Sequence, residues 1–472
     1  MAKEKEIKDF IVAIELGSSK ITGIAGRKNA DGSITVLAYA REESNSFIRR
    51  GKVYNIDKTA QCLSNIKSKL EKTLHAAIGK AYIGIGGQSL HTIRNSVKLP
   101  LPPGTIISKE TIEELKAANR DCTYTEQELL QVIPQEYKVG NVNQIDPVGV
   151  MSDNIEGRYL NVVARNSLHS NVLKCLNIAG IQVAEYFIAP LALADCVLSD
   201  AEKRSGCAIV DLGAETTTVA IYKNNILRHL AVIPLGGANI TKDISAQQIE
   251  EEDAEELKLK YGCAYSDEDA NESNEDKQYQ VTADTTISSK LLNDIVESRV
   301  EEIIANVWEQ INLSNCANEL LSGVVLTGGG SNLRNLELAF TKRTNIEKIK
   351  TAKFVLQAIN AKNPDITSRD GSLNTTLALL IKGKDNCFGH SLEANDALFD
   401  PSGEPYIDHQ AEERKRLEEL AAKQKAMEEE EKKREEEMRK KEEEEIARKK
   451  RQENSLFNKL KKGLASLLSE ED

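Results

Sequence analysis

Two segments of the chain, residues 11–25 and residues 208–222, follow the same pattern 196 positions apart. In each, an apolar run leads to an acidic residue, Glu15 or Asp211, then to Leu-Gly, a short turn of small or polar residues and a second, β-branched run. This order predicts a strand, a tight turn and a second strand. A hairpin repeated at this distance indicates a duplicated domain with a cleft between the copies, although two β-hairpins can also be similar by chance.

A third glycine-rich segment lies at residues 323–331. An apolar run there ends at Thr327 and is followed by three glycines at 328–330. We expect a buried strand and then a turn in which the missing side chains let the backbone approach a ligand closely. The apolar spacing predicts a helix over residues 332–340, with Leu333, Leu336 and Phe340 on one face.

Two further regions separate these segments. Residues 86–165 combine a proline-rich loop at 99–104 with short alternating stretches such as 159–163, which predicts a small inserted α+β domain. Residues 237–319 are mostly helical in pattern, interrupted by an acidic run at 266–280 that we expect to be a solvated surface loop.

Composition restricts the class of protein. The 472 residues carry a formal net charge of −12, which argues against a general nucleic-acid binder because such proteins usually present a basic surface. No apolar stretch approaches the ~18 residues of a membrane-spanning helix, and residues 1–10 lack the apolar core of a secretory signal. The eight cysteines are scattered without CxxC spacing, so we expect buried, reduced thiols in a cytosolic protein.

The three glycine-rich segments together provide what a nucleoside triphosphate and its metal ion need. Small residues in a hairpin turn present backbone N–H groups to phosphate oxygens. A carboxylate at the end of each first strand can orient the water shell of Mg²⁺, which keeps several waters when bound. Glycines before a helix leave room for a base and a ribose. The order of the segments therefore predicts a nucleotide cleft between two related domains.

This order of hairpin, inserted domain, second hairpin, helical region and Gly-Gly-Gly turn resembles the actin/Hsp70/sugar-kinase superfamily. The insertion within the first half, Gly-Cys-Ala at 262–264 and the C-terminal tail resemble the bacterial cell-division family FtsA in particular, over residues 7–390 and 455–468. The resemblance implies an α/β fold of duplicated actin-like (ribonuclease-H-like) domains around a nucleotide cleft, with a small inserted α+β domain. A charged helical or disordered tether and a C-terminal amphipathic helix would follow.

The resemblance also implies domain boundaries. The first actin-like lobe (1A) would comprise residues 6–85, 166–204 and 365–390, and the inserted domain (1C) residues 86–165. The second lobe (2A) would comprise residues 205–236 and 320–364, and a helical subdomain (2B) residues 237–319. A charged linker would occupy residues 391–454, and a membrane-targeting helix residues 455–468.

The same resemblance assigns residues that contact ATP, while catalytic residues stay unassigned. The first phosphate loop would be Gly17, Ser18, Ser19 and Lys20, and the second would contain Asp211, Gly213, Thr216 and Thr217. The adenosine-contacting turn would be Gly328, Gly329, Gly330 and Ser331, with Glu255 and Lys258 lining the ribose and base. Glu15 and Asp211 would hold Mg²⁺ through water.

Two residues depart from the family pattern. The acid of the first loop is usually Asp and is Glu15 here, and the second loop, usually glycine-rich, contains Glu215. A glutamate ~4 Å from a phosphate charge costs about 4 kcal/mol at an effective dielectric constant near 20, so we expect Glu215 to face solvent or to pair with a basic group. The helix expected near residues 188–194 is mostly apolar and offers no clear side chain to position a water. We therefore expect ATP binding with at most slow hydrolysis.

Residues 411–453 hold 16 acidic and 15 basic residues, so nearly all of the net charge belongs to residues 1–410. About ten Glu-to-Lys/Arg pairs at i,i+4 each support an isolated helix by ~0.2–0.5 kcal/mol. The few large apolar residues form no heptad seam, which favours a solvated single helix or a partly disordered tether over a coiled coil.

Residues 455–468 predict a short amphipathic helix. Its apolar face contains Leu456, Phe457, Leu460, Leu464, Leu467 and Leu468, and Lys459, Lys461 and Lys462 lie towards the other face. Docking on the globular core is one alternative, but a long hydrophilic stretch separates the segment from that core. We expect leucines among acyl chains and lysines near anionic headgroups, as in the membrane-targeting helix of the FtsA family. One such helix binds weakly, and polymerisation would supply avidity.

The resemblance implies an actin-like, ATP-binding cell-division protein that polymerises with copies of itself. Such a protein tethers FtsZ filaments to the inner face of the cytoplasmic membrane at the division site, and its inserted domain engages later division proteins. One alternative is a small-molecule kinase of the same superfamily, for which the cleft offers no clear general base. Another is an actin-like relative from pilus assembly. A chaperone ATPase is disfavoured, because no β-rich peptide-binding domain follows the second half.

Overall fold

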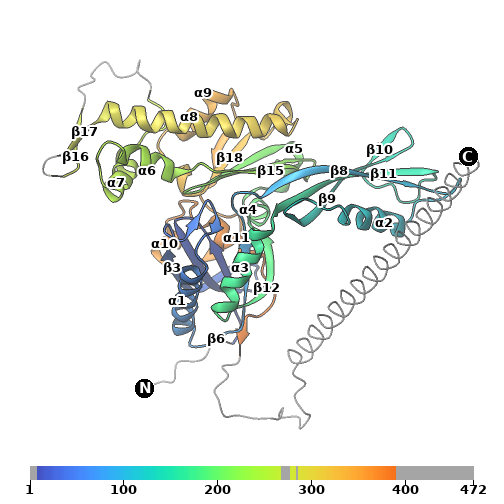
Figure 1. Ribbon diagram of the computed structural model, residues 1–472, viewed down its shortest axis with the longest axis horizontal. Coiled ribbons are helices and arrows are strands. Elements are labelled where there is room, and N and C mark those ends of the chain that lie inside the picture. Colours follow the sequence, from blue (N-terminus) through green and yellow to red (C-terminus); the bar gives the residue numbers. More distant parts are fainter. Residues whose placement is uncertain (1–7, 267–276, 283–284, 390–472) are drawn as a thin grey trace, which may run out of the picture. The chain divides into compact units, whose positions relative to one another are not determined.

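The computed structural model describes residues 8–266, 277–282 and 285–389, which are organised around two β-sheets (Figure 1). The first sheet has six strands, in the spatial order β12 (Gln182–Ile188), β7 (Lys80–Ile85), β1 (Ile11–Leu16), β2 (Lys20–Lys28), β3 (Ile34–Glu43) and β20 (Ile359–Asn360). The second has nine, in the order β10 (Val142–Gln144), β9 (Gln127–Val139), β11 (Asn154–Arg165), β8 (His91–Pro100), β15 (Ile226–Ile233), β14 (Thr217–Lys223), β13 (Cys207–Leu212), β18 (Val324–Thr327) and β19 (Ile349–Thr351).

Five strands of each sheet share one topology. In the first sheet, β1 pairs antiparallel with β2 and parallel with β7, and β2 pairs antiparallel with β3. In the second, β13 pairs antiparallel with β14 and parallel with β18, and β14 pairs antiparallel with β15. β12 and β19 take equivalent outer positions, each parallel to its neighbour. The predicted duplication is confirmed, because chance similarity of two hairpins does not explain five equivalent strands.

Helices cover both faces of the first sheet. α1 (Ile56–Leu74), capped by Asn55, packs against α3 (Asn166–Ile178), and α4 (Ala189–Val197) packs against α11 (Asn374–Lys382). Two glycines of β2 show that α1 and α11 lie on opposite faces, since Gly23 lies against Ile66 of α1 and Gly26 lies against Leu380 of α11. The short elements of this lobe are β4 (Ile48–Arg49), β5 (Lys52–Val53), β6 (Ala77–Ile78), α10 (Pro364–Thr367) and β21 (Phe388–Gly389), whereas α5 (Asp200–Ser205) contacts β14 of the second sheet.

The second lobe contains the predicted helical region. α6 (Gly237–Ser245), α7 (Glu251–Tyr261) and α8 (Ser289–Leu313) lie there, with a two-stranded ribbon of β16 (Gln278–Gln280) and β17 (Thr286–Ser288) before α8 (Figure 1). A 3-10 turn, η2 (Ala317–Glu319), then leads to β18. The buried residues of α8 recur at helical spacing and join one core with strands β13 and β14: Leu292, Val296, Val300, Ile303, Ile304, Val307 and Ile311.

The predicted helix start at residue 332 is wrong. After β18 the chain passes through a 3-10 turn, η3 (Gly329–Asn332), and α9 (Leu336–Thr344) begins four residues later than expected. Asn335 precedes α9 with φ +60, in the left-handed region, so the backbone is not helical between the two elements. Leu336 and Phe340 are buried as predicted.

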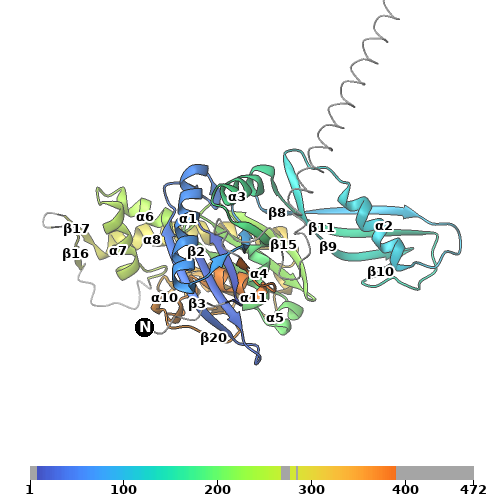
Figure 2. The ribbon, with the colours of Figure 1, turned by 90° about the horizontal axis from the view of Figure 1, so that it is seen from below.

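The inserted domain is a three-stranded antiparallel sheet of β8, β11 and β9, extended by β10, with α2 (Lys109–Arg120) along one face (Figure 2). Ile112 and Leu115 of α2 pack on Tyr137 and Tyr159 of the sheet and form a small core separate from those of the two lobes. One residue pair, His91 with Ala231, joins β8 to β15, so this sheet continues that of the second lobe.

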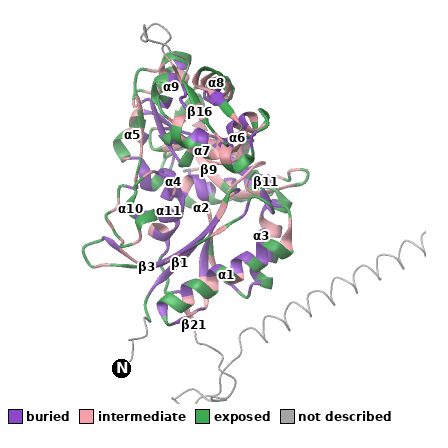
Figure 3. Ribbon diagram, turned by 90° about the vertical axis from the view of Figure 1, so that its left-hand side faces the viewer, coloured by how far each residue is buried: buried purple, intermediate pink, exposed green. Residues whose placement is uncertain are grey.

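Burial follows the sheets. The central strands of both lobes are buried, and the helices present exposed residues on their outer faces (Figure 3). All eight cysteines are free, as predicted, and six of them are buried, whereas Cys122 and Cys316 are only partly buried. Within the described ranges, none of the helices is both long and apolar enough to cross a membrane. The predictions for residues 391–454 and 455–468 lie outside the described residues.

Candidate functional site

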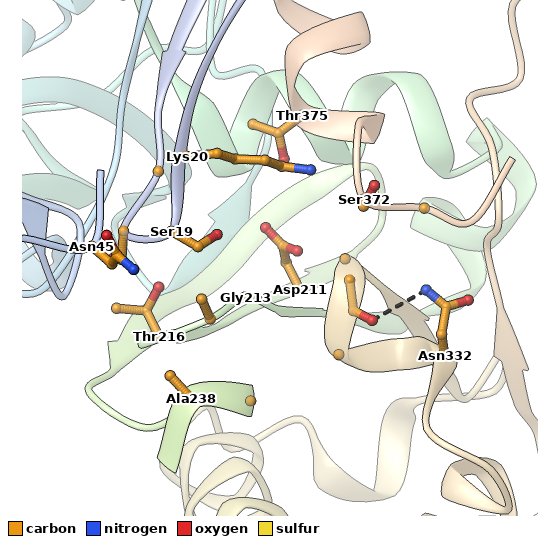
Figure 4. Close-up of a pocket in the computed structure, with 18 of the residues that line it drawn as sticks. Ser19, Lys20, Asn45, Asp211, Gly213, Thr216, Ala238, Asn332, Ser372 and Thr375 are labelled. Atoms are coloured by element: carbon orange, nitrogen blue, oxygen red, sulfur yellow. Dashed lines mark hydrogen bonds between the residues drawn. The ribbon is translucent and has the colours of Figure 1, made fainter. Parts of the chain in front are cut away.

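The two copies of the duplicated fold meet at a cavity of about 1070 Å³. The ends of both hairpins, the start of α6, the glycine-rich turn that contains η3 and the chain leading into α11 contribute to its wall (Figure 4). Residues of α7 line it as well. Most of the predicted ATP-contacting residues line this cavity, and so does Glu15. They are Gly17, Ser18, Ser19, Lys20, Asp211, Gly213, Thr216, Glu255, Lys258, Gly328, Gly329 and Gly330.

The two hairpin turns have the same internal geometry. The Gly17 N–H donates to the Lys20 carbonyl (3.0 Å), and the Gly213 N–H donates to the Thr216 carbonyl (2.8 Å). A Cβ atom would lie 2.7 Å from the Lys20 oxygen in the first turn and 2.9 Å from the Thr216 oxygen in the second. Glycine is therefore required at both positions, and each turn presents small residues to the cavity.

Hydrogen bonds hold the two turns from outside the hairpins. The Ser44 hydroxyl donates to the Gly17 carbonyl at 2.7 Å in the first lobe. In the second lobe, the Gly237 N–H donates to the Gly213 carbonyl (3.0 Å) and the Ala238 N–H to the Ala214 carbonyl (2.7 Å). Both turns are thus fixed before any ligand is bound.

Two carboxylates, one from each lobe, lie at the base of the cavity. Burial, and then the charge of Glu15, raise the pKa of Asp211 to about 7. Burial also raises the pKa of Glu15, although the Thr376 hydroxyl donates a hydrogen bond to its carboxylate and the Lys20 charge lies nearby. Asp211 fits because residue 328 is glycine: a Cβ atom there would lie 2.3 Å from Asp211 Oδ1.

This pair of carboxylates fits a hydrated divalent cation. No group of three or more His, Cys, Asp or Glu side chains able to hold a metal occurs among the residues that the structure describes. Mg²⁺ does not need such a cage, since it usually takes one or two carboxylates, several waters and phosphate oxygens. A cation would also offset the repulsion between Glu15 and Asp211 that contributes to the raised pKa of Asp211.

Lys20 brings a positive charge to the cavity. Figure 4 shows its side chain extending from the end of the first hairpin towards Thr375, with the Asp211 carboxylate below it. Burial lowers the pKa of the Lys20 ammonium, and the charge of Glu15 opposes that shift. The ammonium is thus partly withdrawn from water in a position where it can meet an anionic ligand.

A polar cluster on α6 and α7 forms another part of the wall. Lys258 donates to Glu255 (2.5 Å), to the Thr241 hydroxyl (2.9 Å) and to the Gly237 carbonyl (3.2 Å). The Thr241 hydroxyl in turn donates to Glu255 at 2.5 Å. The Lys258 side chain is 11% exposed and that of Glu255 is 44% exposed, so the cluster presents a carboxylate, rather than the ammonium, to a ligand.

Two of the predicted residues do not line the cavity. The Thr217 hydroxyl donates to the Leu235 carbonyl (2.8 Å), and the Ser331 hydroxyl donates to the Gly328 carbonyl (2.7 Å). Both side chains are buried behind the wall. They support the second hairpin and the glycine-rich turn.

Glu215 pairs with nearby donors, as expected. Its Oε2 accepts a hydrogen bond from the Arg50 backbone N–H (2.6 Å), and its Oε1 lies 3.7 Å from the Lys242 ammonium. Glu215 is not among the residues that line the cavity. The predicted departure from a glycine-rich loop therefore does not bring an unpaired charge into the site.

Comparison with known proteins identifies the family. A family model described as "Cell division protein FtsA" matches residues 208–371, and one described as "SHS2 domain inserted in FTSA" matches residues 87–163. The cell division protein FtsA of Porphyromonas gingivalis is 31% identical over 354 residues, which cover 74% of each chain. The chain belongs to the FtsA family. Its predicted family and its actin-like fold class are therefore confirmed.

Other FtsA proteins support the family, and one solved structure supports the fold. The FtsA of Bacillus subtilis is 30% identical over 68% of this chain and 73% of its own, and that of Escherichia coli is 25% identical over 70% and 80%. A solved "PilM-PilN type IV pilus biogenesis complex" has a TM-score of 0.56 at 15% identity, covering 80% of this chain and 98% of that chain, which shows a shared fold. The three sequence relatives named here carry the name of the cell-division protein, whereas the pilus protein, at 15% identity, shares only the fold.

Several residues that line the cavity of this FtsA-family chain were not predicted. They are contributed by the end of β3 and the chain after it, by α6, by η3 and the chain after it, and by the segment before α11 and the start of α11: Arg41, Asn45, Ala238, Thr241, Asn332, Arg334, Asp370, Ser372 and Thr375. Asn332 donates to the Asp370 carbonyl (2.7 Å) and to the Gly329 carbonyl, which ties two sides of the cavity together. Gly236-Gly237 at the start of α6 and Asp370-Gly371-Ser372 before α11 are turn patterns that could have indicated these positions.

Proposed function

We propose that this FtsA-family chain binds ATP with Mg²⁺ in the cavity between its two lobes. The observation that supports the proposal is the pair of equivalent hairpin turns. In each turn a glycine N–H donates to the carbonyl three residues later, and one carboxylate from each lobe lies at the base of the cavity. Small residues in such turns provide backbone N–H groups for phosphate oxygens. In this proposal both lobes contact one ligand, which stabilises the arrangement of the lobes.

Each part of the wall has a proposed role. The first turn, at 17–20, and Gly213, Ala214 and Thr216 of the second turn hold the phosphates, and Lys20 offsets their charge. Glu15 and Asp211 hold Mg²⁺ through water, and the bound cation supplies neutralisation of phosphate charge. Gly328, Gly329 and Gly330 lie against the adenosine, and Glu255 accepts hydrogen bonds from the ribose hydroxyls while Lys258 holds it in place.

We propose at most slow hydrolysis. α4 presents Ala189 and Pro190 to the cavity, and neither residue can orient a water for attack on a phosphate. The energy of ATP binding, rather than turnover, then favours the closed, polymer-forming state.

We further propose a role as a membrane tether in division. We propose the same division into domains that the sequence predicts, including the linker at 391–454 and the amphipathic helix at 455–468. The helix attaches the protein peripherally to anionic lipid on the cytoplasmic side of the membrane, and polymerisation of the protein supplies avidity. The lobes bind FtsZ, and the inserted domain binds later division proteins.

Co-sedimentation tests the tether. FtsZ filaments are mixed with anionic liposomes and the full chain, with and without Mg²⁺ and ATP. We expect FtsZ to sediment with the liposomes when the full chain is present, more so with ATP, and to remain separate when residues 455–472 are deleted. Equal recruitment of FtsZ by the truncated chain would exclude this role of the terminal helix.

A further inference from the structure

A two-residue turn between β4 and β5 lies at the junction of three parts of the molecule. β4 and β5 pair as a hairpin whose connecting residues are Arg50, at φ +51, and Gly51, at φ +72. Two successive left-handed residues are typical of a type I′ turn, which usually contains Asn-Gly. Arginine rarely adopts this conformation, so surrounding contacts must hold Arg50 there.

The backbone groups of the turn bond to three different parts of the chain. The Arg50 N–H donates to Glu215 of the second lobe (2.6 Å). The Gly51 N–H donates to the Ser18 hydroxyl of the first hairpin turn (2.8 Å). The Arg50 carbonyl accepts from the N–H of Gln88, where the chain enters the inserted domain (2.8 Å). Both hairpin turns of the cavity and the start of the inserted domain thus bond to the same two residues.

The contact with the start of the inserted domain is close. A Cβ atom on Gly51 would lie 2.5 Å from the Cα of Gly87, and one on Gly87 would lie 2.5 Å from the carbonyl oxygen of Gly51. Gly87 has φ +120, and Ser89 has φ +96, a conformation that a serine seldom adopts. The Ser89 hydroxyl also accepts from the N–H of Arg165, at the end of the inserted domain (3.3 Å). Residues 86–89 therefore connect the first lobe to the inserted domain, and we call this connection the hinge.

Glu215 is the member of this junction that belongs to the second lobe. Its side chain is 19% exposed, and its two oxygens divide between the Arg50 N–H and the Lys242 ammonium. A hydrogen bond to a carboxylate is stronger than one between neutral groups. A movement of the second hairpin turn therefore acts directly on Arg50.

We propose that Glu215 is a positioning residue that couples occupancy of the cavity to the hinge of the inserted domain through the Arg50–Gly51 turn. A ligand that contacts both hairpin turns fixes Ser18 and Glu215 relative to each other, and these two residues hold the two N–H groups of the turn. The turn then holds the hinge through Gln88 and Gly87. The part of this inference that concerns ATP rests on the proposed function.

Hydrogen exchange of backbone amides, followed by mass spectrometry on the full chain, tests the coupling. Without nucleotide, we expect Glu215→Ala to speed exchange about tenfold in peptides that cover residues 47–55 and 86–90, since a hydrogen bond to a charged group is lost. Glu215→Gln keeps an oxygen that can accept from Arg50, so its effect should be smaller. Glu347→Ala removes an exposed glutamate of the same lobe that does not line the cavity, and it should match the unmodified chain.

The second arm adds Mg²⁺ and ATP, with the dissociation constant measured in parallel. In the unmodified chain, ATP should slow exchange of residues 86–90 about tenfold. In Glu215→Ala, ATP should still bind but should leave the exchange of residues 86–90 unchanged, and Glu215→Gln should restore part of the response. A purely structural role for Glu215 would change exchange without ATP and leave the response to ATP intact.

The outcomes separate the two proposals. Unaltered exchange at the hinge in Glu215→Ala, or the same ATP response as in the unmodified chain, would overturn the inference while ATP binding stands. No ATP binding by the unmodified chain would exclude the proposed function, and the nucleotide-free arm would still decide whether Glu215 holds the turn. If Glu215→Ala fails to fold, as judged by exchange in β13, Glu215→Gln and Lys242→Ala carry the test.

Discussion

At the scale of single residues, Asp211 makes a prediction about pH. Its pKa is about 7 in the folded protein without ligand, against about 4 for an ordinary aspartate. The folded state therefore retains a proton that the unfolded state loses, and this side chain makes the fold less stable as pH rises from about 4 to 7. Asp211→Asn should raise the melting temperature of the nucleotide-free protein at pH 8, and much less at pH 5.

Binding of Mg²⁺ and ATP should depend on the same group. Asp211 must lose its proton to interact with the cation, so affinity should rise about tenfold between about pH 6 and about pH 8. Asp211→Asn should bind weakly at both values and lose this dependence. Titration with Mg²⁺ and ATP at constant ionic strength over this pH range measures the affinities. If Asp211→Asn showed the same pH profile as the unmodified chain, this role of Asp211 would be contradicted.

Gly328 offers a second prediction at this scale. Its φ is +84 and a Cβ atom would lie 2.3 Å from Asp211 Oδ1, so Gly328→Ala should cost about 1–3 kcal/mol of stability and displace the carboxylate. We expect nucleotide binding to be lost and the melting temperature to fall. Gly104→Ala is the control, since Gly104 also has a left-handed φ (+76) and lies outside the cavity, but its Cβ atom would meet nothing within 4 Å. Equal effects of the two variants would show that Gly328 has no special role.

Residues of the cavity could be predicted from the sequence where they belong to a local sequence pattern. The two Leu-Gly turns and the three glycines at 328–330 were found this way. Thr376 and Asn332 were not, because each acts across the fold: Thr376 donates to Glu15, 361 positions away, and Asn332 to Asp370. Such contacts depend on tertiary packing and leave no short-range spacing to read.

At the scale of elements, the polar cluster on α6 and α7 predicts how replacing Lys258 changes stability and nucleotide binding. This buried ammonium satisfies three acceptors on the two helices, and Lys258→Met leaves Glu255 without its ion pair. We expect a loss of about 1–3 kcal/mol in the free energy of unfolding and weaker nucleotide binding. Chemical denaturation and titration measure the two effects. Lys353→Met, at an exposed lysine, is the control, and an identical result for both would exclude a role for the cluster.

Strands and helices were predictable to different degrees. The hairpins β1–β2 and β13–β14 follow from alternating apolar runs around a turn, and the structure has both. The late start of α9 follows from the left-handed Asn335, which helical periodicity does not reveal. The continuation of the second sheet into the inserted domain rests on the pairing of His91 with Ala231, 140 positions apart, and no local signal encodes such a long-range contact.

At the scale of the whole molecule, membrane attachment is predicted from residues 455–468. Leu460→Glu with Leu464→Glu places two charges on the predicted apolar face and should weaken binding to anionic liposomes at least about tenfold. Ser455→Glu with Ser469→Glu adds the same charge outside that face and should retain most of the binding. Flotation of the full chain with liposomes measures both, and equal loss in the two double variants would show that only net charge matters.

The cavity between the two lobes is tested most directly by equilibrium titration of the full chain with a fluorescent ATP analogue in the presence of Mg²⁺. We predict saturable binding to the unmodified chain, displaced by unlabelled ATP and abolished by Asp211→Ala. Absence of saturable binding, or binding that Asp211→Ala leaves unchanged, would contradict the assignment of this cavity as an ATP site.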